Sequence, residues 1–571
     1  MIRALVLLMA LVLLETACTG GAPSTGSRSS APASSAQPAQ PSRTLVVAVV
    51  DEPKTLAARL IGQVGRSLHF RRIFNADLAL LDDQKNPLPY LAEKLPQLNT
   101  DDWKVFPDGT METTYHLRPN LVWHDGTPLT ADDFVFSWEV FSTPELGQAR
   151  SVPFRSIADV QAPDDRTILI HWTQPYADAG ELQSLGASAL SGLPPLPRHI
   201  LGSALDEGAS SFVNAPYWTQ EYVGLGPYKL DRWEPGAFLE ASAFDRHALG
   251  VAKIPHVKLL FLGDDNAMLA SMLSGDAQYA SNVGVPQTAT LIQQWGASGG
   301  HMVPYFNSYT AAHFQSRTDF VSPAALQDRR VRQALAYAID KSALNDALFN
   351  GQNLIADSPW APTSELGKAA NAAAIKYPLD LNRSAQVMQE AGFARPSGGE
   401  FYVGPGGDPF SFELKGGEGD DAMTSSVASG LRQAGFGVTQ SVLARAQAQD
   451  VQTKSSYPGL QISQTGGGEG AMNGMGTRQI PGPENGWRGS AWDGYSNSEM
   501  DRLIAAFSVA LDPADRTRTA ADFVKLYTTD LPAIPLFFPV SPQVFPSSLT
   551  GPKLRPASSN PTWNIYEWEL R

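Results

Sequence analysis

The chain has 571 residues, of which 43% are hydrophobic and 18% are charged, so it suffices for about three or four domains and can bury large cores. Its formal net charge of −14 disfavours nucleic-acid binding, because a protein that follows a phosphate backbone needs clustered Lys and Arg. The single cysteine, Cys18, excludes an internal disulfide and a zinc site of the CxxC kind.

The first seventeen residues have the layout of a secretory signal. Arg3 precedes a short apolar run over residues 4–14, and two small residues stand directly before Cys18. The run is too short for a membrane span, which needs about 20 apolar residues. Segment 1–17 resembles a bacterial lipoprotein signal, which implies that Cys18 is acylated, although Glu15 stands where such signals usually carry Leu. The alternative is a plain secretory signal with an incidental cysteine.

Residues 19–43 are mostly Ser, Ala, Pro, Gly and Gln, with no large apolar side chain. Such a composition cannot bury enough surface to offset the entropy of ordering, so we expect a flexible tether that spans on the order of 25–30 Å. The sequence therefore predicts a lipid-anchored linker over 18–43, followed by a body that works outside the membrane.

The body opens with a β-branched apolar run over 44–50, which predicts a buried strand. A turn at 124–128 and a helix over 131–141 follow later. Thr130 stands at the N-cap position of that helix and Asp133 three residues on, as in a capping box. The i, i+4, i+7 spacing predicts one buried aromatic face, formed by Phe134, Trp138 and Phe141.

Strands and helices alternate through the rest of the body. Strands are predicted at 114–117, 167–172 and 532–540, and a hairpin at 224–244. The apolar periodicity predicts helices at 266–275, 328–340, 341–351, 383–393, 422–436, 498–511 and 513–527. Gly392 and Gly435 stand at the C-terminal ends of two of them. This mixture predicts an α/β fold without internal repeats.

The sequence shows no local pattern of catalysis, of a metal site or of a cofactor. His116 and His124, the closest histidine pair, are eight residues apart, and HExxH, GxxxxGK[ST] and GxSxG are all absent. The glycine-rich stretch 465–476 lacks the strand-to-helix spacing of a dinucleotide site. The residues alone therefore disfavour an enzyme, and we expect no catalytic residues, metal or cofactor.

Residues 114–139 carry a recognisable block, TYHLRPNLVWHDGTPLTADDFVFSWE. It resembles the signature block of the family 5 extracellular solute-binding proteins, the peptide-, dipeptide- and nickel-type receptors of ABC importers. Further blocks resemble that family in the same order, at 224–230 (with Leu225 in place of the usual Thr), 329–340, 495–504 and 534–538. The resemblance covers about residues 44–571.

The resemblance implies a bilobal clamp of the periplasmic-binding-protein type (type II, the large cluster with an extra subdomain). The first lobe is expected to comprise 44–80, 216–308 and 528–571, the inserted subdomain 81–215, and the second lobe 309–527. A solute would bind in the cleft and be enclosed by hinge closure. The implied partner is an ABC permease, the expected state is a monomer, and the expected location is the cell surface or periplasm.

Peptide binders of this family commonly hold the amino terminus of the ligand with an Asp near a Trp-x-x-Asp motif in a second-lobe loop. The equivalent region here is 461–497, which departs from that motif. It offers acidic residues (Glu484 among them), two tryptophans as aromatic walls, an arginine for a carboxylate, and adaptable methionines such as Met475. The predicted ligand-binding residues are Glu469, Met472, Asn473, Trp487, Arg488, Trp492 and Asp493. The alternative is that this region is only an irregular surface loop.

Three functions stay open from the sequence. The first is a receptor for peptides, and the second is a receptor of the same fold for another solute, such as an oligosaccharide that stacks on tryptophan. The third is an extracellular hydrolase. Turnover of a bound ligand would distinguish the third from the first two.

Overall fold

The computed structural model describes residues 43–59, 68–83, 86–146, 149, 152–183, 192–296, 299–306, 308–417, 420–443, 447, 450–485, 487, 489–553 and 561–571. The predicted signal over 1–17, Cys18 and the linker up to residue 42 lie outside these residues. Residues 43–571 form one unit, which is described below as two bodies defined by their sheets.

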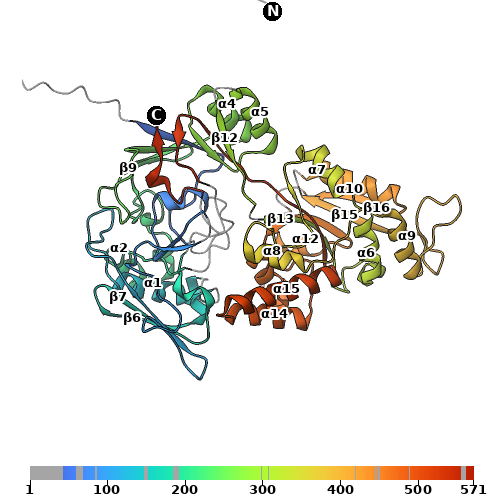
Figure 1. Ribbon diagram of the computed structural model, residues 1–571, viewed down its shortest axis with the longest axis horizontal. Coiled ribbons are helices and arrows are strands. Elements are labelled where there is room, and N and C mark those ends of the chain that lie inside the picture. Colours follow the sequence, from blue (N-terminus) through green and yellow to red (C-terminus); the bar gives the residue numbers. More distant parts are fainter. Residues whose placement is uncertain are drawn as a thin grey trace, which may run out of the picture. The chain divides into compact units, whose positions relative to one another are not determined.

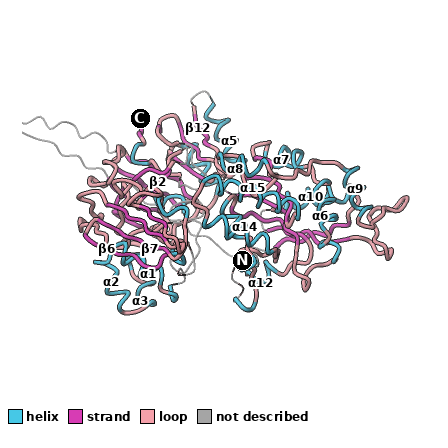
Figure 2. The backbone as a smooth tube through the Cα atoms, turned by 60° about the horizontal axis from the view of Figure 1, so that its bottom comes forward, coloured by secondary structure: helices cyan, strands magenta, loops and turns pink. Residues whose placement is uncertain are grey.

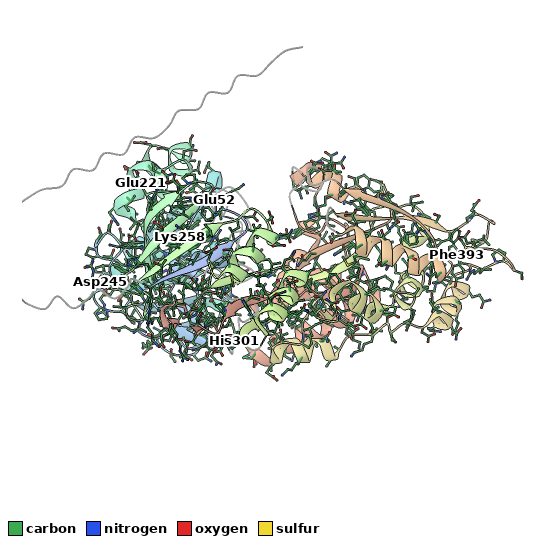
Figure 3. All side chains as sticks on the ribbon, turned by 90° about the horizontal axis from the view of Figure 1, so that it is seen from above. Glu52, Glu221, Asp245, Lys258, His301 and Phe393 are labelled. Carbon is green, nitrogen blue, oxygen red and sulfur yellow. The ribbon has the colours of Figure 1, made fainter. Side chains whose placement is uncertain are left out.

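A seven-stranded sheet joins three distant parts of the chain, in the order β12-β19-β11-β1-β10-β9-β8. Its strands are β1 (Thr44–Val49), β8 (Tyr228–Glu234), β9 (Phe238–Ala243), β10 (His256–Phe261), β11 (Tyr279–Ser281), β12 (Gly300–Val303) and β19 (Gln543–Pro546). Strand β1 is parallel to both of its neighbours, β10 and β11, and is almost wholly buried, as its β-branched run predicts. Lys258 of β10, labelled in Figure 3, pairs with Glu240 at 3.1 Å and covers the Phe238 ring at 3.6 Å, which fastens the edge hairpin.

A four-stranded antiparallel sheet, in the order β4-β5-β7-β6, lies in the same part of the molecule as the seven-stranded sheet. Its strands are β4 (Trp103–Val105), β5 (Met111–His116), β6 (Ile157–Asp164) and β7 (Thr167–Trp172). Helix α1 (Asp132–Ser142) contacts β6, and α2 (Arg198–Asp206) contacts both α1 and α3 (Ala209–Val213), as Figure 1 shows for α1 and α2. Two short strand pairs complete this part of the molecule. They are β2 (Ala79–Leu81) with β3 (Pro87–Pro89), and β20 (Leu549–Thr550) with β21 (Glu569–Leu570). We call residues 43–303 and 543–571 the first body.

The start of α1 confirms half of the predicted capping box. Asp133 accepts a hydrogen bond from the backbone N–H of Thr130 at 3.1 Å, but no side chain caps the helix from its N-cap position, Ala131. The buried aromatic face contains Phe134 and Phe141 as predicted, whereas Trp138 is only partly buried. Phe136, which the i, i+4, i+7 pattern omits, is buried in its place because the four-stranded sheet and α2 cover two sides of the helix.

A six-stranded sheet, in the order β14-β18-β13-β17-β15-β16, forms the second body, residues 308–538. Its strands are β13 (Ser308–Phe314), β14 (Leu354–Ile355), β15 (Ser411–Gly417), β16 (Gly437–Leu443), β17 (Leu460–Gly466) and β18 (Ala533–Phe538). Its helices are α6 (Arg329–Tyr337), α7 (Lys341–Phe349), α8 (Glu365–Ala372), α9 (Leu381–Glu390), α10 (Asp421–Gln433), α12 (Val451–Ser455), α13 (Glu469–Gly474), α14 (Ser498–Val509) and α15 (Pro513–Asp530). Helix α10 packs on β15 and β16 (Figure 1), and α6 packs on α9 (Figure 2).

Most predicted helices are present with ends shifted by a few residues, among them α4 (Asp265–Ser274), which was predicted at 266–275. Helix α5 (Val285–Trp295) of the first body was not predicted. Gly392 and Gly435 have φ values of +90° and +96°, which confirms that they end α9 and α10 in the left-handed conformation. The strand pairing of β18 differs from the lobe boundaries expected from the sequence. Strand β18 lies in the range 528–571 assigned to the first lobe, but it pairs with β13 and β14 of the second body. Its six residues are all buried and need a partner on each edge, which that sheet provides. The remaining lobe limits stay a prediction.

Two segments cross between the bodies. One runs from β12 to β13 and the other from β18 to β19. The N–H of Ser541 donates to the carbonyl of Tyr305 at 2.8 Å, so the two crossings are hydrogen-bonded to each other. Such paired crossings allow the two bodies to rotate about one narrow connection.

Candidate functional site

A pocket of about 320 Å³ opens in the second body, and every residue that lines it belongs to that body. The lining comes from β13, β17, α13, α15 and β18 and from the turn 490–493. This volume lies at the lower end of the range of about 300–1,000 Å³ that small-molecule sites occupy. Much of the pocket wall therefore comes from region 461–497, which the sequence singles out.

Asp493 brings a carboxylate into this pocket. The residue is only 7% exposed, its Oδ2 lies 3.4 Å from Nδ1 of His313, and its Oδ1 accepts the backbone N–H of Tyr495 at 3.1 Å. A carboxylate offers about four lone-pair positions, so Asp493 keeps acceptor capacity for a ligand. A buried negative charge is costly unless it is paired, so a cationic group is the favoured occupant.

Three further buried polar atoms around the pocket have no hydrogen-bond partner among the described residues. They are Nε2 of His313, Oη of Tyr457 and Oε1 of Gln461, and all three residues line the pocket. A buried polar atom without a partner costs about 1–3 kcal/mol, which a ligand that binds it would recover. Burial, followed by the negative charge of Asp493, raises the pKa of Tyr457 well above its ordinary value, so its hydroxyl stays protonated and can donate.

Trp492 lines the pocket beside Asp493, and one of its faces is covered. The Lys454 ammonium lies 3.1 Å from the centroid of the indole ring. Burial lowers the pKa of Lys454 to about 8, and no carboxylate of the described residues lies within ion-pair distance of it. The Trp492 Nε1 donates to the carbonyl of Gly489 at 3.1 Å, which fixes the ring across the turn.

A polar frame behind the pocket fixes the turn that carries Trp492 and Asp493. The side-chain amide of Gln315 donates to the carbonyls of Ser455 and Tyr457, at 3.0 and 2.9 Å. The guanidinium of Arg317 donates to the carbonyls of Pro481 and Trp492, at 3.0 and 2.5 Å. The residues of this frame come directly after β13, so the strand that supplies His313 also positions the turn that supplies Asp493.

Four of the predicted ligand residues lie in three different settings. Trp492 and Asp493 line the pocket. Glu469 opens α13, where it pairs with Arg516 at 3.0 Å. Met472 is fully buried in the core beneath, because its position on α13 faces the body and not the pocket.

The other predicted ligand residues are not brought to the pocket wall. Asn473 is exposed to solvent on α13. Trp487 is half-buried and has a left-handed backbone, with φ of +59°. Arg488 and the side chain of Glu484 lie outside the described residues.

Sequence reasoning missed His313, Tyr457 and Gln461. None belongs to a motif, and each reads as part of an ordinary strand or loop. Only the antiparallel pairing of β13 with β17, with His313 opposite Gln461, brings two of them together. The pairing register of separate strands is not visible in the spacing of residues along the chain.

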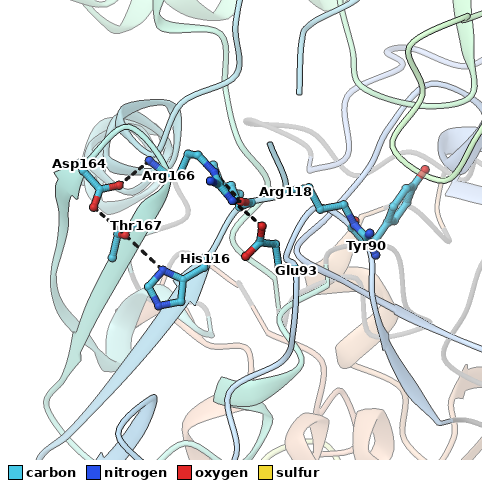
Figure 4. A network of polar contacts seen from close by, with 8 residues as sticks. Tyr90, Glu93, His116, Arg118, Asp164, Arg166 and Thr167 are labelled. Carbon is cyan, nitrogen blue, oxygen red and sulfur yellow. Dashed lines mark hydrogen bonds and ion pairs between the residues drawn. The ribbon is translucent and has the colours of Figure 1, made fainter. Parts of the chain in front are cut away.

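The two histidines of block 114–139 have structural contacts. His124 lies against the loop of the second block, with its Nε2 3.0 Å from the carbonyl of Gly226 and its Nδ1 3.2 Å from the N–H of Gly224. Burial lowers the pKa of His124 to about 4, so it is neutral at pH 7. His116 bonds the Thr167 hydroxyl at 3.2 Å in the network of Figure 4.

The same network shows the role of the Leu-Arg pair of that block. Arg118 donates to the carbonyls of Tyr90 and Pro89, at 2.6 and 3.2 Å, and Arg166 bonds the carbonyl of Leu117 and the carboxylate of Glu93 (Figure 4). The block therefore builds the first body, and neither of its histidines lines the pocket.

The described residues contain neither a candidate metal site nor a candidate membrane-spanning helix. Among them, no three His, Cys, Asp or Glu side chains are grouped so that they could hold a metal ion. No helix in the same part of the chain has the length and apolar character to span a membrane.

The family model described as "Bacterial extracellular solute-binding proteins, family 5 Middle" matches residues 93–480. The oligopeptide-binding protein AppA of Bacillus subtilis is 24% identical over 569 residues, which cover 99% of this chain and 97% of AppA. Among solved structures, NikZ of Campylobacter jejuni in complex with Ni(L-His) aligns with a TM-score of 0.73 and 21% identity, over 93% of this chain and 100% of NikZ. The oligopeptide-binding protein of Thermus thermophilus with a pentapeptide aligns with a TM-score of 0.72 and 21% identity, over 92% and 96% of the two chains.

These structural likenesses establish the fold. The mixed sheets of the two bodies and the neighbours together confirm the predicted α/β clamp of the periplasmic-binding-protein type II. At these identities the likeness fixes the arrangement of the chain, whereas the ligand must be argued from the residues of the pocket.

Proposed function

The chain belongs to the family 5 bacterial extracellular solute-binding proteins, and on that premise we propose that it captures a peptide-like solute by the amino group and delivers it to an ABC permease. As a member of this family it is a binding protein of an importer and not an enzyme, which sets aside the hydrolase hypothesis. Its work is therefore to hold a solute outside the cytoplasm without changing it.

The observation that carries the proposal is the set of acceptors around the pocket. With its ring proton on Nδ1, which faces Asp493, His313 presents Nε2 as an acceptor. Together with Oε1 of Gln461 and the Asp493 carboxylate, this makes three acceptors for the three N–H bonds of a primary ammonium. Charge-assisted hydrogen bonds of this kind are among the stronger ones in proteins.

A peptide explains this set better than a neutral sugar does. A sugar has no cation to pair with Asp493, and the Lys454 ammonium already covers one face of Trp492 that a sugar ring would use for stacking. The relatives are named for oligopeptides, or hold a peptide or a histidine complex of nickel, and each of those ligands contains an amino acid. An oligosaccharide remains the alternative outcome of the test.

The test compares affinities by isothermal titration calorimetry. Short peptides with free amino termini should bind, whereas the same peptides with acetylated amino termini and a panel of oligosaccharides should bind much more weakly. The substitution Asp493→Asn keeps the acceptor for the Tyr495 N–H but removes the charge, and it should weaken peptide binding about 10- to 100-fold, since a hydrogen bond to a charged group contributes about 1.5–3 kcal/mol.

The matched control is Asp319→Asn, which makes the same change at an exposed position of the second body outside the pocket. Its affinity should equal that of the unmodified protein. Equal affinities for the Asp493 variant and the control would contradict the assignment. Binding of sugars that survives Asp493→Asn would favour the alternative solute.

We also propose that Cys18 carries a lipid that anchors the protein to the outer face of the membrane, with residues 18–43 as the tether. The proposal rests on the signal-like residues 1–17. Metabolic labelling with a fatty acid should mark the unmodified protein and leave Cys18→Ser unmarked. The anchor would be refuted by unmodified protein that takes up no label.

A further inference from the structure

A second group of charged residues lies outside the pocket and joins the two bodies. The guanidinium of Arg516, in the first turns of α15, lies 3.3 Å from the Asp178 carboxylate and 3.0 Å from that of Glu469. It also lies 4.4 Å from the centroid of the Phe507 ring. Asp178 is part of the short helix η4 (Ala177–Gly180) of the first body, whereas Glu469, Phe507 and Arg516 belong to the second body. We call Asp178, Glu181, Glu469 and Arg516 the Arg516 cluster.

The Arg516 cluster is next to the pocket. Glu469 opens α13, and the following residue, Gly470, lines the pocket wall. Leu511, two residues before the start of α15, packs against the main apolar core of the first body. The turn before α15 thus contacts the first body by an apolar side chain, and the first turns of α15 contact it by an ion pair.

Negative charge exceeds positive charge in the Arg516 cluster. One guanidinium faces three carboxylates, from two bodies of the molecule. Burial, followed by the charges of Asp178 and Glu469, raises the pKa of Glu181 to about 8. Burial and Glu469 likewise raise the pKa of Asp178, against the opposing effect of Arg516. Tyr176, which faces the same charges, stays a neutral phenol because burial raises its pKa well above the ordinary value.

We propose that Arg516 is a positioning residue for solute capture, which holds the two bodies closed around the pocket, and that closure takes up a proton on the carboxylates it gathers. The proposal rests on the proposed function in that the pocket holds the solute. Rotation about the two crossing segments would separate Asp178 and Glu181 from Arg516 and Glu469. In the open state the two carboxyl groups of the first body would then return to water.

The direction of the pH effect follows from this separation. The pKa of Glu181 is raised in the closed state and falls towards the ordinary value of 4.5 when the bodies part. Between about pH 4.5 and 8 Glu181 therefore takes up as much as one proton on closure, so a lower pH favours the closed state, and this group changes the ratio of closed to open protein by at most tenfold for each pH unit. The proton-linked gain is complete below about 4.5 and is lost as the pH rises through about 8.

The experiment measures closure without any solute. Spin labels at Glu221 and Lys525, both exposed and on different bodies, report the distance between the bodies by double electron–electron resonance in the full chain with Cys18→Ser. The closed population should grow as the pH falls from 8.5 to 6. In Glu181→Gln the change of the closed population between pH 8.5 and 6 should be much smaller, because only Asp178 is left to take up a proton, and in Arg516→Gln the closed population should be smaller at every pH.

The matched control is Arg518→Gln, on the same helix, where the arginine is exposed and pairs only with its neighbour Asp515. It should behave as the unmodified protein does. The proposal is overturned if the closed population of the unmodified protein is independent of pH, or if the Arg516 and Arg518 variants give the same distances. A pH-dependent closure in a protein that binds no peptide would instead refute the proposed solute and leave the proposal on Arg516 standing.

Discussion

At the scale of single residues, the pocket is marked by buried polar atoms that lack hydrogen-bond partners. His313, Tyr457 and Gln461 each present a buried atom without a partner among the described residues, and Asp493 adds a negative charge. Natural proteins pair almost all such atoms, so several around one pocket indicate a ligand. No single one of them would carry this conclusion.

Trp492 allows a test of the pocket wall. Replacement by Ala removes a half-buried wall of the pocket and the surface on which the Lys454 ammonium rests, so peptide affinity should fall about tenfold, or about 1.4 kcal/mol. The melting temperature should change little, because the residue lies on a turn outside the core clusters.

Trp487→Ala is the control for this change. That tryptophan is in the same loop, is also half-buried, and does not line the pocket. Affinity should stay unchanged in the control. Equal losses in both variants would place the solute elsewhere in the loop, and no loss in the Trp492 variant would remove this residue from the site.

At the scale of elements, the sequence predicted most helices and strands but did not predict which strands pair with one another. The strand at 44–50, the helix at 131–141 and the end of α9 at Gly392 follow from local periodicity and caps, and the structure confirms them. The assignment of β18 to the first lobe was wrong, because an apolar run shows that a strand is buried but not which strands it pairs with. His313 and Gln461 could not be predicted as pocket residues for the same reason, because they become neighbours only through the pairing of β13 with β17.

The turn at residues 224–226 gives a test at this scale. A Cβ on Gly226 would lie 2.4 Å from the backbone nitrogen of Asn75 and 2.6 Å from the carbonyl oxygen of Ile73, both of which are backbone atoms that cannot rotate away. Gly226→Ala should therefore destabilise the protein by about 1–3 kcal/mol.

Gly430 is the matched control. It lies inside α10, where a Cβ meets nothing within 4 Å. The change to Ala there should stabilise the protein by about 0.5–1 kcal/mol, since Ala is the better helix former. Thermal or denaturant unfolding of the two variants measures both effects. A stable Gly226→Ala variant would contradict the packing of this turn on residues 73–75.

At the scale of the whole molecule, recognition and closure are assigned to different places. The polar atoms that select a solute lie in the second body alone, whereas Arg516 and Leu511 connect that body to the first. Family resemblance predicted the clamp from blocks spread over residues 44–571, and the fold confirms it. It did not predict the solute, because none of the blocks it rests on supplies a residue that lines the pocket. Blocks 114–139 and 224–230 belong to the first body, and the other three lie in the second body outside the lining.

The most direct measurement of the central claim is a crystal structure of the protein with a bound short peptide. The account predicts that the amino-terminal nitrogen lies about 2.7–3.2 Å from the Asp493 carboxylate and bonds Nε2 of His313 or Oε1 of Gln461. A peptide bound with its amino terminus away from Asp493, with the pocket beside β13 and β17 left to water, would contradict it.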